Sequence, residues 1–220
     1  IFFRPRRPAL MEQQRALLQS VHKELQAKQG QDHLLAPYMA TPPVVVAPVM
    51  QLAAVGPEDT VFDIGCGDGR LLCAAAKLGA QCYGWDISPE AVEDAKQLIA
   101  KEGIEEKVSV HCADALAEAE RIPWAEATVV VLYMGVRGNL TLRPLLLRHL
   151  QTGVRLVTVQ FHMGNWKPEQ MVHVDSHELH HDQPTMPLQL YVVNEAARSL
   201  ADVSEEELQQ WTLATVGHGS

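Results

Sequence analysis

The clearest fold signal in this sequence is the stretch Val61-Phe62-Asp63-Ile64-Gly65-Cys66-Gly67-Asp68-Gly69-Arg70. Its apolar first half predicts a β-strand that ends in an acid, and glycines then alternate with other residues. Glycine at 65, 67 and 69 allows a sharp turn and leaves no Cβ between the backbone and a ligand. Residues 70–78 predict a helix whose free N–H groups face the same point. A strand, turn and helix of this kind form half of a nucleotide site.

The spacing of the glycines narrows the class of ligand. The dinucleotide motif G-x-G-x-x-G would place its third glycine at position 70, where this chain has Arg70. Asp63 stands just before the first glycine, and a negative charge there suits a positively charged ligand better than a pyrophosphate. S-adenosylmethionine fits, because it carries an amino group and a sulfonium. Cys66 lies inside the turn and is expected as a small residue beside the ligand, since a catalytic thiol would need a nearby base.

Two further acids are expected at the same edge of the sheet. The second predicted strand ends in Asp86, near the spacing of about 20 residues at which such βαβ units carry a ribose-binding carboxylate. The third leads to Asp114, whose carboxylate can accept a hydrogen bond from the exocyclic amine of adenine. Ile87 and Ala113 adjoin these acids and are predicted to contact the cofactor. Three strand ends thus present three acids where open α/β folds bind ligands.

Apolar and β-branched runs predict the remaining elements. The expected strands cover 80–86, 107–112, 127–133 and 154–160, with two more near 171–174 and 188–193. The expected helices cover residues around 44–55, 89–102 and 142–150. The last two strands would supply the antiparallel pair that ends the sheet.

Four motifs extend the pattern beyond the glycine turn. They are Pro37-Tyr38-Met39-Ala40-Thr41-Pro42, Leu132-Tyr133-Met134, Leu142-Arg143-Pro144-Leu145-Leu146 and His162-Met163-Gly164-Asn165-Trp166-Lys167-Pro168. With these, the sequence resembles the class I (seven-strand) S-adenosylmethionine-dependent methyltransferases, and in particular a branch that includes small protein-lysine methyltransferases and bacterial relatives. Known eukaryotic members of that branch modify mitochondrial carriers and ATP synthase subunits. The resemblance covers roughly residues 35 to 195.

The resemblance implies an α/β fold, a Rossmann-like three-layer α/β/α sandwich with a seven-stranded, mostly parallel sheet and an antiparallel last strand. It also implies that Tyr38 and Thr41 close over the cofactor. Tyr133 and Met134, after the fourth strand, are candidates for the wall of the acceptor pocket, although Tyr133 could instead cap the core. Trp166 could stack on a substrate or pack under its own loop. No residue is a convincing general base.

Composition agrees with one main domain. The 220 residues are 47% hydrophobic and 20% charged, enough for one α/β core and short for two. We expect a methyltransferase domain over 35–195, preceded by a basic tail and amphipathic helix over 1–34. Residues 196–220 are expected to form a C-terminal tail with a short helix. No apolar run approaches the ~20 residues that span a bilayer, so an integral membrane protein is not expected.

The charge and the cysteines restrict partners and compartment. A formal net charge of −9 disfavours nucleic acid, because phosphate contacts need concentrated Lys and Arg. The four cysteines form no C-x-x-C pair and no disulfide-like framework, which favours a reducing intracellular compartment, cytoplasmic or mitochondrial. No metal is predicted, since His173, His177, His180 and His181 lack a metal-ligand spacing.

Several functions remain open at this point. A protein-lysine methyltransferase is favoured, and a small-molecule methyltransferase would share all the cofactor residues. A non-catalytic S-adenosylmethionine-binding scaffold would keep the sheet without turnover, although the intact trio Asp63, Asp86 and Asp114 argues against it. The motif Asn-Pro-Pro-aromatic is missing after the fourth strand, which disfavours DNA and glutamine acceptors. The sequence does not indicate an oligomeric state.

Overall fold

The computed structural model describes residues 39–176 and 185–216, and side chains up to Trp211. The described residues belong to one compact unit. The predicted N-terminal tail and helix lie outside them, as do Tyr38 and three of the four histidines considered above. No helix in the described part of the chain has the length and apolar character needed to cross a membrane.

A seven-stranded sheet forms the centre of this unit, with the order β3-β2-β1-β4-β5-β7-β6. Strands β1 to β5 are parallel to their neighbours, whereas β7 runs antiparallel to both β5 and β6. The predicted fold class is therefore confirmed, including the antiparallel last strand. The strands are β1 (Thr60–Ile64), β2 (Gln81–Asp86), β3 (Val108–Cys112), β4 (Val129–Leu132), β5 (Arg155–Val159), β6 (Gln170–Asp175) and β7 (Thr185–Val192).

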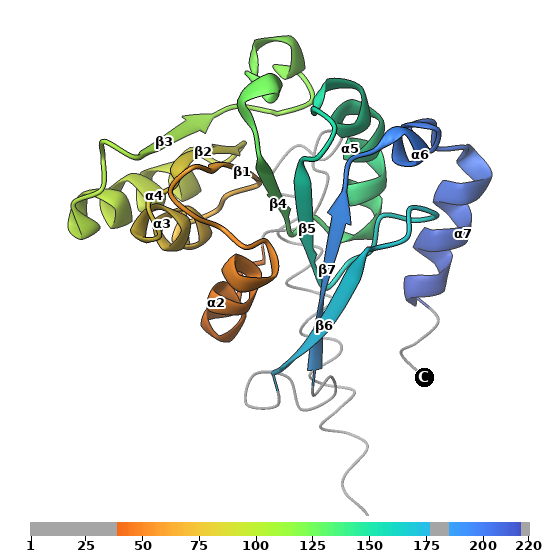
Figure 1. Ribbon diagram of the computed structural model, residues 1–220, viewed down its shortest axis with the longest axis horizontal. Helices are drawn as coiled ribbons and strands as arrows, with labels where there is room; N and C mark the ends of the chain where they lie inside the picture. The colour runs from red at the N-terminus through yellow and green to blue at the C-terminus, as the bar shows by residue number, and fades with distance from the viewer. Residues whose placement is uncertain (1–38, 177–184, 217–220) are drawn as a thin grey trace, which may run out of the picture. The chain divides into compact units, whose positions relative to one another are not determined.

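Helices cover the two faces of the sheet, with α2, α3 and α4 on one side and α5, α6 and α7 on the other (Figure 1). The helices are α2 (Pro43–Leu52), α3 (Arg70–Lys77), α4 (Pro89–Glu102), α5 (Gly135–His149), α6 (Glu195–Arg198) and α7 (Glu205–Val216). Two short 3₁₀ turns, η1 (Ala119–Arg121) and η2 (Trp124–Glu126), precede β4.

Helix α5 begins well before the predicted helix at 142–150. Its first turns contain Gly135, Gly138 and Asn139, which are weak helix formers, and Pro144 lies inside it. Val136 and Leu140 are nevertheless buried, so burial of this face outweighs the low helix propensity. The local sequence concealed a helix that tertiary packing stabilises.

The central strands are buried on both faces, as expected for a parallel sheet covered by helices. All of β4 is buried, and every one of its residues is apolar. Gly84 in β2 lets helix α3 approach closely, because a Cβ at this position would lie 2.6 Å from Leu72 Cδ1 and 2.8 Å from Cys66 Sγ. The glycine turn is thus held against the sheet by tight packing.

Helices α6 and α7, which we expected in a tail, pack in the same unit as the sheet. Arg143 of α5 is fully buried, and its guanidinium donates to both carboxylate oxygens of Glu207 in α7, at 2.7 and 2.9 Å. Arg143 Nη1 also donates to the carbonyl of Met163 at 2.9 Å, and the N–H of Asn165 donates to Glu207 at 3.0 Å. The ion pair therefore anchors the loop that follows β5, and joins two of the motifs quoted above.

Candidate active site

The glycine turn between β1 and α3 has the conformation that its residues predict. Gly65, Gly67 and Gly69 have φ values of +78°, +53° and +74°, a region that favours glycine. The N–H groups of Gly65 and Cys66 donate to the carbonyl of Trp85 at 2.7 and 3.1 Å. The end of β2 thus fixes the path of the turn, and the first N–H groups of α3 follow directly behind it.

Asp63 is the last acid before this turn and is 3% exposed. Burial raises the pKa of its carboxyl to about 8, with smaller contributions from the charges of Asp86 and Asp68. A buried carboxyl of this kind ionises readily only when a positive group approaches it. The position predicted from sequence to face a cation therefore has the electrostatics of a cation-binding acid.

Cys66 is inside the turn and 6% exposed. Burial, with the nearby Asp63 charge, raises the pKa of its thiol. The thiol stays protonated at neutral pH, so it is a poor nucleophile. This agrees with Cys66 as a small residue of the turn.

Asp86 joins the ends of β1, β2 and α4. Its carboxylate accepts hydrogen bonds from the N–H of Gly67 and the N–H of Ser88, both at 2.9 Å. Ser88 in turn caps α4, because its hydroxyl accepts from the N–H of Ala91 at 3.2 Å. Asp86 is partly exposed, and each carboxylate oxygen has a second lone pair for a ligand.

The third predicted acid lies next to this group. The N–H of Ala113 donates to the carbonyl of Asp86 at 2.9 Å, which places the end of β3 beside the end of β2. Asp114 accepts from the N–H of Leu116 at 2.8 Å. Ile87, immediately after Asp86, is an exposed large apolar residue with 42% of its surface accessible. The fold thus brings the predicted acids and their apolar neighbours to one edge of the sheet.

The segment before α2 is tied to the glycine turn. Arg70 donates from Nη1 to the carbonyl of Thr41 at 2.5 Å, and from Nε to both oxygens of Asp68 at 2.9 and 3.0 Å. Thr41 is 8% exposed. The Arg70 that breaks the dinucleotide motif therefore connects the turn to the segment expected to close over a cofactor.

The end of β4 touches the same turn. A Cβ at Gly65 would clash with the sulfur of Met134, so these two residues are in close contact. Tyr133 is half-buried, and burial raises the pKa of its phenol. Its hydroxyl donates to Gln160 Oε1 at 2.9 Å, and its ring stacks on Phe161 with a centroid distance of 5.8 Å.

Gln160 was missed by the sequence analysis. It directly follows β5 and ends the predicted strand 154–160. A polar residue at the carboxyl end of a buried parallel strand, next to an aromatic residue, is the signal that could have found it. Trp166, in contrast, is 5% exposed and packs on Tyr191 with a centroid distance of 5.0 Å. This is the packing alternative rather than the stacking one, so the acceptor pocket discussed below is built without Trp166.

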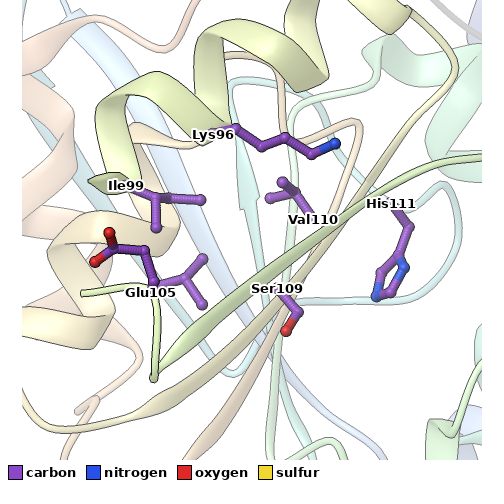
Figure 2. A pocket seen from close by; sticks show the side chains of 7 residues that line it. Lys96, Ile99, Glu105, Ser109, Val110 and His111 are labelled. Atoms are coloured by element: carbon purple, nitrogen blue, oxygen red, sulfur yellow. The ribbon is translucent and has the colours of Figure 1, made fainter. Parts of the chain in front are cut away.

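A surface groove is found elsewhere, along the outer strand β3. Figure 2 shows Lys96 and Ile99 of α4 beside Ser109 and His111 of β3, with Glu105 from the loop between them. None of the residues predicted for the site lines this groove. Within 39–176 and 185–216 there is also no group of three His, Cys, Asp or Glu side chains suited to a metal ion.

Comparison with known proteins agrees with this geometry. The family model described as the ANTKMT methyltransferase domain matches residues 63–170. A protein-lysine N-methyltransferase of Saccharolobus islandicus is 31% identical over 161 residues, covering 72% of this chain and 94% of the relative. A human lysine N-methyltransferase, whose name specifies one of the ATP synthase subunits, is 26% identical over 110 residues, which cover 50% of this chain and 46% of that protein.

A solved structure resembles the fold as a whole. An RNA methyltransferase from Salinibacter ruber in complex with S-adenosyl-L-homocysteine has a TM-score of 0.64 and 29% identity, covering 76% of this chain and 97% of that one. Its ligand is the product that remains when S-adenosylmethionine has given up its methyl group. The glycine turn, the strand-end acids and the buried Asp63 fit this cofactor. The chain therefore belongs to the ANTKMT methyltransferase family and is an S-adenosylmethionine-dependent methyltransferase.

Proposed function

We propose that this methyltransferase acts on the side-chain amine of a lysine in a protein. The observation that carries the proposal is the match to the Saccharolobus protein-lysine N-methyltransferase, which extends over 94% of that protein at 31% identity. The human relative is also named for a lysine substrate. A net charge of −9 favours approach of a lysine-bearing, basic protein surface over approach of a polyphosphate.

The cofactor roles are proposed for the residues at the sheet edge. Asp63 would pair with the amino group, and Asp86 would accept from the ribose hydroxyls. Asp114 would accept from the adenine amine, with Ile87 against the ring. The remaining proposed contacts are Tyr38 and Thr41 above the cofactor, the turn residues Gly65, Cys66, Gly67 and Gly69 below it, and Ala113 beside the base.

We assign the acceptor pocket to Tyr133, Met134 and their neighbours Gln160 and Phe161. S-adenosylmethionine supplies an electrophilic methyl carbon bonded to a sulfonium, and an amine lone pair can attack it in line with the departing sulfur. A lysine ammonium, with an ordinary pKa of about 10.4, has no such lone pair. Half-buried Tyr133 and apolar Met134 disfavour a charged amine by removing water from it, so the proton passes to solvent before transfer. Tyr133 itself stays protonated because its pKa is raised, and so it is not the base.

The acceptor class is tested by transfer of labelled methyl. The chain is incubated with methyl-tritiated S-adenosylmethionine and a cell extract, which is then separated into protein, RNA and low-mass fractions. Label in protein supports the proposal. Label only in RNA would instead match the Salinibacter relative, and label only in the low-mass fraction would indicate a metabolite acceptor.

The cofactor residues are tested by Asp86→Ala. This change removes the acceptor for the Gly67 N–H at 2.9 Å together with the proposed ribose contact. We expect S-adenosylmethionine binding to weaken by about 10- to 100-fold, the range for loss of charged hydrogen bonds, with the fold retained. Asp94→Ala removes the same charge from an exposed position of α4 and should bind normally. Equal binding by both variants would show that Asp86 is not in the site.

The reducing compartment, cytoplasmic or mitochondrial, stays a proposal, and it is compatible with the free thiols of Cys66, Cys73, Cys82 and Cys112.

A further inference from the structure

Gln160 adopts a backbone conformation that its residue type disfavours. Its φ is +65°, and among the described residues only Gln160 and Ala54 are non-glycine residues with positive φ. Such a conformation persists where the surroundings hold it, and it is frequent at functional sites. Here the N–H of Gln160 donates to the carbonyl of Pro187 at 2.7 Å, so the antiparallel strand β7 fixes the strained residue at the end of β5.

This conformation connects the ends of two neighbouring strands. The Gln160 side chain accepts the Tyr133 hydroxyl at 2.9 Å, and the next residue, Phe161, stacks on the Tyr133 ring. The carbonyl of Phe161 accepts from Asn139 Nδ2 of α5 at 2.9 Å. Side chains from β4 and backbone from β5 are thereby locked together beside Met134, which contacts the glycine turn.

The direction of the Tyr133 hydroxyl bond has a chemical consequence. A phenol has one proton and two acceptor lone pairs. When its proton is held by Gln160 Oε1, the oxygen can only accept a hydrogen bond from an incoming group. A freely rotating hydroxyl could instead donate its proton to the lone pair of a neutral amine, and that lone pair would then be occupied rather than available to attack a methyl carbon.

We propose that Gln160 is a positioning residue for the acceptor amine, which it orients through Tyr133. Gln160 holds the Tyr133 proton, the Tyr133 oxygen accepts an N–H of the deprotonated lysine, and the lysine lone pair is left free. The inference rests on the proposed lysine acceptor and adds a residue that the sequence motifs did not include. Gln160 acts on the reaction without supplying or removing a proton in it.

The test uses the full chain, methyl-tritiated S-adenosylmethionine and poly-L-lysine as acceptor. Gln160→Gly removes the side chain and relaxes the backbone, so we expect kcat to fall about tenfold, the worth of one directed hydrogen bond. S-adenosylmethionine affinity should not change. Ala54→Gly is the matched control, because it relieves positive φ at an exposed position after α2 and should leave kcat unchanged. Neither variant should lower the denaturation midpoint.

A double-mutant cycle separates positioning from general damage. If Gln160 acts through the Tyr133 hydroxyl, then Gln160→Gly should have little further effect on kcat in a Tyr133→Phe background. Equal effects in both backgrounds, or an unchanged kcat for Gln160→Gly alone, would overturn the inference. A wild-type chain that methylates neither poly-L-lysine nor extract protein would overturn the proposed lysine acceptor and this inference with it, which is a different result.

Discussion

Binding of S-adenosylmethionine is expected to expel a proton from Asp63. Burial raises the pKa of this carboxyl to about 8, so at pH 7 roughly nine in ten molecules hold it protonated. The amino group of the cofactor, with an ordinary α-amino pKa near 8, is mostly positive at that pH. Pairing the two charges requires the ionised carboxylate, so about 0.9 proton should leave for each cofactor bound.

The same shift sets the pH dependence of affinity. Ionising a carboxyl one pH unit below its pKa costs about 1.4 kcal/mol, or tenfold in binding, and two units below costs about hundredfold. Affinity should therefore rise about tenfold from pH 6 to pH 7 and level off near pH 8, where the ligand amine begins to lose its charge.

Calorimetric titration in two buffers of different ionisation enthalpy measures the released proton directly. Asp63→Asn should bind more weakly, release no proton and show a flat pH profile. It should also melt at a higher temperature than wild type at pH 8 without ligand, because a raised carboxyl pKa makes the folded chain lose stability as pH rises from about 4 towards 8. Wild type that releases no proton at pH 7, or an Asn variant that keeps the slope, would refute this reasoning.

Two further changes test packing around the site. Gly65→Ala would press a Cβ against the Met134 sulfur at φ +78°, so we expect a loss of about 1–3 kcal/mol in stability and weaker cofactor binding in a melting assay. Gly153→Ala also has positive φ but opens into free space, and it should lose less stability and bind normally; equal binding losses would contradict the contact. Glu207→Gln leaves the fully buried Arg143 without a carboxylate and should cost about 3–5 kcal/mol in urea unfolding. A smaller cost would mean that water reaches the Arg143 charge, and replacing the pair as Arg143→Met with Glu207→Leu should recover most of the loss.

The cofactor half of the molecule was predictable because its signals are local. Positive φ at Gly65, Gly67 and Gly69 follows from residue type, and strand ends in a parallel sheet meet at one edge, which places Asp86 and Ala113 together. The comparisons confirmed the family and the cofactor, whereas the individual residue roles stay proposals.

The acceptor half was harder because its structure depends on tertiary contacts. The start of α5 was missed since its glycines disfavour a helix and only packing stabilises it. Glu207 and Arg143 are 64 residues apart, and no local pattern reveals such a pair. The strained φ of Gln160 is imposed by neighbouring strands, and a glutamine gives no sign of it in sequence.

The central claim is methyl transfer to a lysine amine, and chemical identification of the product tests it most directly. Protein labelled by the chain and tritiated S-adenosylmethionine is hydrolysed to amino acids, and the label is separated by chromatography against methylated standards. We predict that the label elutes with mono-, di- or trimethyl-lysine and is lost when Asp63→Asn replaces the wild-type chain. Label in methyl-arginine, methyl-histidine or an acid-labile ester would contradict the lysine acceptor.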